Sequence, residues 1–237
     1  MIDHRCIELI AVTENELKEA NTIALAGCGV IYVVPELIQM AGVARSLSNA
    51  RYEICAMIDY PKGECEGVAK FRGVQTDFFL TDSYDIVLTA NLNPSKIAHE
   101  ISSIYSFIQT MINPHAKICF TINASMRTSE SIEMCAKAFM KHPPSKIKLE
   151  ASPTTQPTKA NVGVHKKTMK LIRQHYVSPI VISGNISYKA YKQFAIINKI
   201  AVSPQQYYKL IEDDQKASQC TDLDQDQDLD QDIKVDD

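Results

Sequence analysis

The 237-residue sequence lacks the motifs that mark several common classes of protein. It has no run of 18 apolar residues and no signal peptide, so we expect neither a membrane span nor export. It contains no G-x-S-x-G and no Walker lysine, which argues against serine-hydrolase and nucleotide-kinase functions. A G-x-G-x-x-G is also missing, because residues 27–29 supply only a G-x-G. The sequence therefore offers no nucleotide-binding fingerprint.

Cysteine and histidine are present, but without the spacing of a metal site. None of the seven cysteines forms a C-x-x-C pair, and their number is odd. Several lie in apolar runs, where cysteine behaves as a small hydrophobe, so we predict a reduced, cytoplasmic protein. None of the six histidines has a second His or Cys at ligand spacing. We therefore predict no metal and no cofactor.

The negative charge is concentrated at the C-terminal end. Residues 213–237 hold ten Asp and two Lys, a net charge of −8, which leaves +5 for the remainder because the total is −3. This Asp- and Gln-rich segment has too little apolar area to offset its ordering entropy. We predict one domain at 1–212 and a disordered acidic tail at 213–237, either solubilising or binding a basic partner. The dispersed positive excess elsewhere suits a small phosphorylated molecule and argues against nucleic acid.

Short β-rich runs alternate with segments of helical apolar spacing. Seven runs occupy 29–34, 52–59, 84–90, 116–123, 145–152, 179–184 and 197–203. An eighth, at 22–27, either forms a strand or ends the first helix. Strands separated by helices build parallel sheets, and seven or eight repeats in this length favour a single (β/α)8 TIM barrel over an open doubly wound sheet.

Six segments occur in an order and spacing shared with one enzyme family. They are IDHR (2–5), GCGVIYVVP (27–35), ICAMIDYPKG (54–63) with Lys70 behind it, KIKLEAS (146–152), VGVHKKTMKLIRQ (162–174) and PIVISGNIS (179–187). Together they resemble deoxyribose-phosphate aldolases over about residues 2–205. The resemblance implies a lyase that cleaves 2-deoxyribose 5-phosphate to glyceraldehyde 3-phosphate and acetaldehyde.

The resemblance also implies which lysine would react. In that family a strand-6 lysine forms a Schiff base with the sugar aldehyde, a strand-7 lysine lowers its pKa, and a strand-4 aspartate helps to move protons. Lys148 matches the Schiff-base lysine. Strand alternation places it on the inward face with Lys146 and Glu150. The structural alternative is that Lys148 pairs with Glu150 or extends to the rim.

The two helper positions of the family are changed in this sequence. The strand-4 aspartate position falls on Val87, with Asp85 two residues away on the same face, so a two-residue shift of the alignment would place Asp85 there. The strand-7 lysine position falls on Val181, and no lysine lies within four residues of it. Glu150 is a candidate acid–base replacement, although a nearby carboxylate raises the pKa of a lysine and keeps it charged. We therefore expect impaired aldolase chemistry.

The phosphate site implied by the family is also reduced. Gly184 and Ser203 remain as phosphate-binding candidates, whereas Asn185 replaces a glycine and Pro204 replaces a serine. Pro204 has no backbone N–H to donate. A small phosphorylated sugar is the expected ligand if this pocket still functions.

Three functions therefore stay open. The first is a Schiff-base aldolase of low activity that uses Lys148. The second is a catalytically inactive homologue that acts as a binding or assembly partner, as a homo-oligomer or beside an active paralogue. The third is a barrel that acts on a different aldehyde through Lys148 and Glu150.

Overall fold

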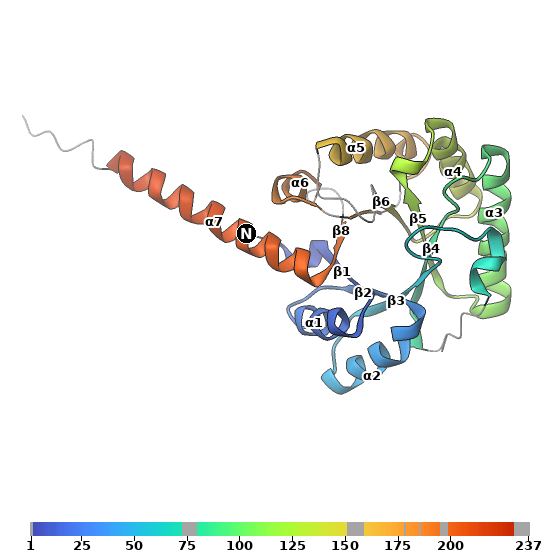
Figure 1. The fold of residues 1–237 in the computed structure, drawn as a ribbon, viewed down its shortest axis with the longest axis horizontal. Coiled ribbons are helices and arrows are strands. Elements are labelled where there is room, and N and C mark those ends of the chain that lie inside the picture. Colours follow the sequence, from blue (N-terminus) through green and yellow to red (C-terminus); the bar gives the residue numbers. More distant parts are fainter. Residues whose placement is uncertain are drawn as a thin grey trace, which may run out of the picture.

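The structure is a computed structural model that describes residues 2–72, 80–150, 159–177, 179–184, 186–194 and 199–229, without the side chains of 159–163 and 219–229. Its centre is a closed barrel of parallel strands in the order β1 to β8, with β8 pairing back to β1 (Figure 1). The strands are β1 (Ile7–Ala11), β2 (Val30–Val33), β3 (Glu53–Ile58), β4 (Ser83–Val87), β5 (Lys117–Asn123), β6 (Lys146–Glu150), β7 (Ile180–Ser183) and β8 (Lys199–Val202).

Helices surround the barrel and cover its outer face (Figure 1). They are α1 (Glu14–Ala24), α2 (Ile38–Ser48), α3 (Pro94–Phe107), α4 (Ser129–Lys141), α5 (Lys159–Arg173), α6 (Tyr188–Phe194) and α7 (Pro204–Leu229). The larger core lies between the strands and these helices and includes Ile147 and Leu149 of β6. A smaller apolar cluster fills the barrel itself and includes Tyr32, Met57 and Val181. The predicted single TIM barrel is confirmed.

The sequence prediction missed the first strand. β1 has the sequence IELIA and is fully buried, but it is short and contains a glutamate. The uncertain run at 22–27 ends the first helix instead of forming a strand. α1 begins with a capping box, in which Thr13 and Glu16 satisfy each other's backbone N–H groups. The helix then reaches Ala24 and is followed by Gly27 at a φ of 113°.

The C-terminal helix crosses the predicted domain boundary at residue 212. α7 begins at Pro204 and continues to Leu229, and it extends away from the barrel (Figure 1). Within the part predicted as tail, the Asp214 carboxylate accepts hydrogen bonds from the Ile2 amide at 3.1 Å and the Tyr188 hydroxyl at 2.5 Å. The boundary stays a prediction, and residues 230–237 lie outside the described part of the chain.

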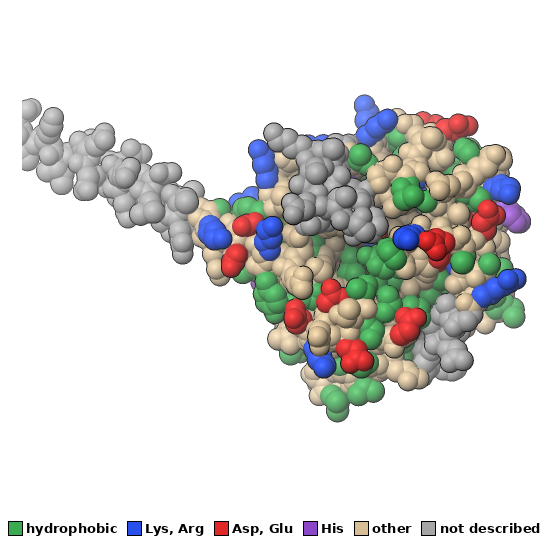
Figure 2. Space-filling model, viewed as in Figure 1, with side chains coloured by type: hydrophobic (Ala, Val, Ile, Leu, Met, Phe, Trp, Pro, Cys, Tyr) green, Lys and Arg blue, Asp and Glu red, His purple; other side chains and the backbone are tan. Residues whose placement is uncertain are grey.

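Hydrophobic side chains gather near the centre of the face shown in Figure 2, with acidic side chains beside them.

A helix long and apolar enough to cross a bilayer does not occur among the described residues.

Candidate functional site

The central polar feature of the barrel is an ion pair between Lys148 of β6 and Asp85 of β4. Both side chains are completely buried. The second carboxylate oxygen of Asp85 accepts a hydrogen bond of 2.6 Å from the hydroxyl of Thr121 on β5, the strand between them. Asp85 therefore has a partner on each oxygen, and Lys148 is neutralised inside the barrel.

This pairing bears on two alternatives that the sequence left open. Val87 holds the position that the resemblance assigned to the strand-4 carboxylate, and Asp85, two residues earlier on the same strand, reaches the lysine. Lys148 forms its ion pair with Asp85 and is fully buried, so it neither pairs with Glu150 nor extends to the solvent at the rim. The register explains the reach, because Val87 and Lys148 both pair with Thr121 while Asp85 lies one inward-facing position below. The strand-7 neighbour of Lys148 is Val181, as expected.

Two tyrosines enclose the Lys148 amine. The Nζ atom lies 4.5 Å from the centre of the Tyr32 ring and 5.5 Å from the centre of the Tyr60 ring. These distances are typical of cation–π contacts, which stabilise an ammonium out of water. The amine therefore has aromatic faces and a carboxylate around it in place of solvent.

A second charged group lies one level deeper in the barrel. Glu8 of β1 is fully buried and pairs with Lys146 at 3.1 Å and Lys199 at 3.3 Å. It also accepts a hydrogen bond of 2.5 Å from the hydroxyl of Tyr32, and the Nζ atom of Lys146 lies 5.4 Å from the Tyr32 ring centre. Sequence reasoning missed Glu8 because it missed β1; the signal was a lone acid within an apolar run.

The Tyr60 side chain is held in place by the turn that follows β3. Asp59 adopts a φ of 59°, and its carboxylate accepts a hydrogen bond of 2.7 Å from the buried amine of Lys70. Gly63 closes the turn at a φ of 66°, where an added Cβ would lie 2.6 Å from the Leu88 carbonyl oxygen. Only glycine fits this close approach without strain. Lys70, one of the residues that carry the family resemblance, thus anchors the turn that carries Tyr60.

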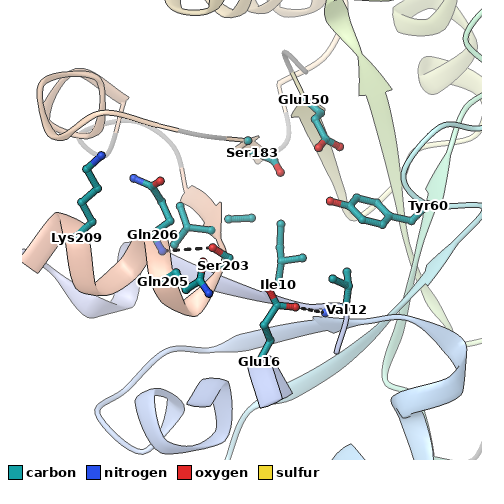
Figure 3. Close-up of a pocket in the computed structure, with 13 residues that line it drawn as sticks. Ile10, Val12, Glu16, Tyr60, Glu150, Ser183, Ser203, Gln205, Gln206 and Lys209 are labelled. Atoms are coloured by element: carbon teal, nitrogen blue, oxygen red, sulfur yellow. Dashed lines mark hydrogen bonds between the residues drawn. The ribbon is translucent and has the colours of Figure 1, made fainter. Parts of the chain in front are cut away.

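A pocket of about 390 Å³ opens at the carboxyl ends of the strands, and we call it the rim pocket. Its described lining residues are Ile10, Val12, Glu16, Tyr60, Glu150, Ser183, Gly184, Ala201, Val202, Ser203, Gln205, Gln206 and Lys209. Figure 3 shows the polar ends of Glu150, Ser183 and Tyr60 pointing toward one another. Lys148 is not among these lining residues.

Glu150 and Ser183 are neighbours in the β6–β7 register. Both side chains are buried, and neither the Glu150 Oε2 atom nor the Ser183 Oγ atom has a hydrogen-bond partner among the described residues. Burial raises the pKa of Glu150 to about 7, although the Lys148 charge opposes that shift. Burial also raises the pKa of Tyr60 to about 12, so its hydroxyl stays protonated at neutral pH.

The two phosphate-binding candidates both lie on the rim pocket. Gly184 follows β7 at a φ of 107°, a conformation that favours glycine. Ser203 precedes α7, and its hydroxyl accepts a hydrogen bond of 3.3 Å from the Gln206 amide. Asn185, noted with them, lies outside the described residues.

The electrostatics of Lys148 keep it protonated. Burial alone would lower the pKa of this amine, but the carboxylates of Asp85 and then Glu150 raise it, and the net shift is upward. A neutral amine is what Schiff-base formation needs. Glu150 thus lies where the sequence analysis placed it, and its effect on the lysine opposes nucleophilic attack.

Within the described residues, no group of three or more His, Cys, Asp or Glu side chains is arranged to hold a metal ion. The six described cysteines are free thiols.

Comparison with solved structures places this fold among known barrels. A structure described as "QR15, an Aldolase" matches with a TM-score of 0.65 and 17% identity, covering 93% of this chain and 99% of that one. A tetrameric deoxyribose phosphate aldolase from Aeropyrum pernix matches with a TM-score of 0.67 and 14% identity, covering 87% and 88%. A putative deoxyribose-phosphate aldolase from Toxoplasma gondii ME49 matches with a TM-score of 0.64 and 13% identity, covering 88% and 94%. In fold, this chain is similar to the deoxyribose-phosphate aldolases.

The likeness concerns the fold alone, because the identities are low. A putative copper homeostasis protein, CutC from Streptococcus agalactiae, matches with a TM-score of 0.57 and 12% identity, over 83% and 96% of the two chains. No family model matches the sequence, and no curated protein matches it. Function therefore has to be argued from the site.

Proposed function

We propose that this chain is a non-catalytic barrel of aldolase-like fold that binds a small molecule in the rim pocket. The observation that carries the proposal is the burial of the Lys148 amine in its ion pair with Asp85. A class I aldolase needs the opposite arrangement, with a neutral amine that the carbonyl carbon of the substrate can reach.

Protonation is the first obstacle to Schiff-base chemistry. A lysine with an ordinary pKa of about 10.4 is neutral in roughly one molecule per thousand at pH 7. The carboxylates around Lys148 make that fraction smaller still, because its pKa is shifted upward. The adjacent position on β7 holds Val181, so no like charge at this position opposes the shift.

Access is the second obstacle. Tyr60 lines the rim pocket and its ring centre lies 5.5 Å from the Lys148 amine, whereas Lys148 is fully buried and is not among the described lining residues. The turn that carries Tyr60 is anchored by the Asp59–Lys70 ion pair. A substrate carbonyl in the rim pocket would meet Glu150, Ser183 and Tyr60 before it met the lysine.

One observation favours the alternative function, an aldolase of low activity that cleaves 2-deoxyribose 5-phosphate. Lys148 and Asp85 lie together on β6 and β4, the strands on which the family resemblance places the Schiff-base lysine and the proton-moving aspartate. In that case Lys148 would be the nucleophile, and Asp85 in place of Glu150 would carry protons. A different aldehyde as substrate would use the same pair.

Borohydride trapping separates these functions. The protein is incubated with 2-deoxyribose 5-phosphate or with a panel of other aldehydes, reduced, and mapped by mass spectrometry, while turnover is followed in parallel. We expect no adduct on Lys148 and no turnover. The matched control is Lys146→Met, which removes a lysine of the same strand that pairs with Glu8. An adduct with turnover that survives Lys146→Met and disappears in Lys148→Met would overturn the proposal.

A further inference from the structure

Two oxygen atoms at the base of the rim pocket have no hydrogen-bond partner in the part of the chain that the structure describes. The Glu150 and Ser183 side chains are 2% and 0% exposed, and the Oε2 and Oγ atoms have no partner among the described residues. A buried polar atom without a partner costs about 1–3 kcal/mol. Such a cost is removed when a ligand in the pocket supplies the missing hydrogen bonds, so these two atoms point to a ligand.

The side chains at the bottom of the rim pocket are suited to binding hydroxyl groups. A carboxylate accepts two hydrogen bonds, and a serine or tyrosine hydroxyl both donates and accepts. Figure 3 shows the Tyr60 hydroxyl pointing toward the same space as Glu150 and Ser183. Neighbouring hydroxyls on a sugar or polyol can satisfy all three groups at once, because each hydroxyl also donates and accepts.

The walls fit the carbon skeleton of such a ligand. Ile10, Val12, Ala201 and Val202 give the pocket an apolar side, and Gln205 and Gln206 give it amides at the α7 side. Its volume of about 390 Å³ falls within the usual range for small-molecule sites, about 300–1,000 Å³. Mixed apolar and polar walls of this kind suit a ligand with C–H faces and hydroxyl edges.

The usual donors for a phosphate are already used at the start of α7. Pro204 has no N–H, and the Gln206 amide donates to the Ser203 hydroxyl at 3.3 Å. The backbone N–H of Tyr207 donates to the backbone carbonyl of Ser203 at 2.9 Å. The first turn of α7 thus offers a phosphate few free N–H groups, although helix N-termini commonly bind anions.

The charges at the pocket also oppose a phosphate. Of the described lining residues, Lys209 is the one cation, and it is exposed. Glu16 and Glu150 are the acids of the same lining. Phosphate recognition normally uses several donors or a bidentate arginine, so a dianion would gain little here. It would be repelled by the Glu16 carboxylate and by Glu150 whenever that group is ionised.

We propose that the rim pocket binds a neutral polyhydroxylated molecule, a free sugar or sugar alcohol, and that it has lost selectivity for phosphorylated sugars. The proposal rests on the small-molecule binding function proposed above and names its ligand class. Glu150 and Ser183 bind ligand hydroxyls, and Tyr60 closes the side of the pocket nearest Lys148. The sequence expectation of a phosphorylated sugar held by Gly184 and Ser203 stays a prediction, and the titration below decides between the two ligand classes.

Calorimetric titration of the full chain with matched pairs tests the proposal. The pairs are 2-deoxyribose with its 5-phosphate and ribose with its 5-phosphate, and ribitol serves as a polyol without a carbonyl. We expect ribitol or the free sugars to bind, and the phosphate group to give no gain in affinity. Tighter binding of either phosphate by about tenfold or more, or no binding by any free sugar or polyol in the millimolar range, overturns the inference.

Variants locate the site. Glu150→Leu and Ser183→Ala should each weaken ribitol binding by about tenfold or more, because each removes a hydrogen bond to the ligand in a buried position. Lys137→Ala, which changes an exposed lysine of α4 that is not among the lining residues of the pocket, should leave that affinity within about twofold. Melting curves of each variant show that the fold is intact. If Glu150→Leu and Ser183→Ala both leave the ribitol affinity unchanged, the ligand binds elsewhere and the inference is overturned.

The two proposals fail in distinguishable ways. Ribitol has no carbonyl and cannot form a Schiff base, so its binding tests the ligand class independently of catalysis. A trapped adduct with turnover would overturn the non-catalytic function, whereas a preference for phosphorylated sugars without an adduct would overturn the ligand class alone.

Discussion

The ammonium of Lys148 and the carboxylate of Asp85 meet inside the barrel although β5 separates their strands. Thr121 on that intervening strand donates to the same carboxylate at 2.6 Å. The pair is therefore held by three adjacent strands and has no exposed surface. The pair matters for stability because removing one partner would leave the other charge buried without a counter-charge, which is strongly unfavourable.

Removing one partner of this pair should destabilise the barrel. We expect Lys148→Met to lower the free energy of unfolding by about 3–5 kcal/mol, since it leaves the Asp85 carboxylate buried and unpaired. The measurement is urea denaturation at pH 7. The double variant Asp85→Leu with Lys148→Met should recover most of the loss, because apolar replacement of a whole buried pair is often neutral or stabilising. A single variant as stable as the parent would contradict the structure.

Replacing Glu150 should stabilise the protein at high pH. The pKa of Glu150 is raised to about 7, so between its ordinary value and pH 7 the folded protein binds more protons than the unfolded chain. Its contribution to stability therefore falls as pH rises through this window. Glu150→Leu should gain on the parent by about 1–3 kcal/mol between pH 4.5 and pH 8. Urea denaturation across that range measures the difference.

The control for this prediction is Glu19→Leu, which changes an exposed glutamate of α1. Its stability difference from the parent should vary little with pH. A Glu150→Leu variant that becomes less stable than the parent at pH 8 would show that the ionised carboxylate is favourable where it lies.

His165 of α5 should make the fold sensitive to acid. Burial lowers the pKa of this histidine to about 4, and its ring meets Phe194 edge-on at 6.0 Å. Between pH 6.5 and pH 4 the unfolded chain binds a proton that the folded protein does not, so stability falls as pH falls through this window. The loss should be on the order of 3 kcal/mol and should be absent in His165→Leu. Parallel stability–pH curves for the two proteins would refute this assignment.

Asp214 should matter to stability although it lies beyond the predicted domain boundary. Its carboxylate accepts hydrogen bonds from the Ile2 amide and the Tyr188 hydroxyl, linking α7 to the N-terminus and to α6. We expect Asp214→Ala to cost about 1–3 kcal/mol, and Asp213→Ala to cost less than about 0.5 kcal/mol. Thermal and urea denaturation measure both. Equal effects of the two substitutions would argue against the proposed contacts.

The sequence predicted the barrel well because most strands are apolar runs separated by helical spacing. β1 was missed because its five residues include Glu8, whose charge interrupts an apolar pattern unless its partners on β6 and β8 are known. Those partners lie more than 130 residues away in the chain, so no local signal reveals them. Long-range charge pairing inside a barrel is therefore the part of the fold that a single sequence conceals.

The candidate site was predicted in part. Strand alternation correctly placed Lys146, Lys148 and Glu150 on the inward face of β6. Of the alternatives for Lys148, the structure shows the pairing with Asp85. The sequence could not select it, because the partner depends on the stagger between β4 and β6, which the sequence of neither strand specifies. The enclosing role of Tyr60 was not foreseen either, since it follows from a turn anchored through Lys70.

The apolar cluster inside the barrel has a consequence for any return to aldolase chemistry. Val181 lies in that cluster with Tyr32 and Met57, at the register position beside Lys148. A lysine restored at 181 would have to find room among these side chains. Its charge would lie at the register position beside the Lys148 ammonium, and the carboxylate of Asp85 is already engaged by Thr121 and Lys148. A single reverse substitution should therefore harm folding before it helps catalysis, so the change on β7 is difficult to undo one step at a time.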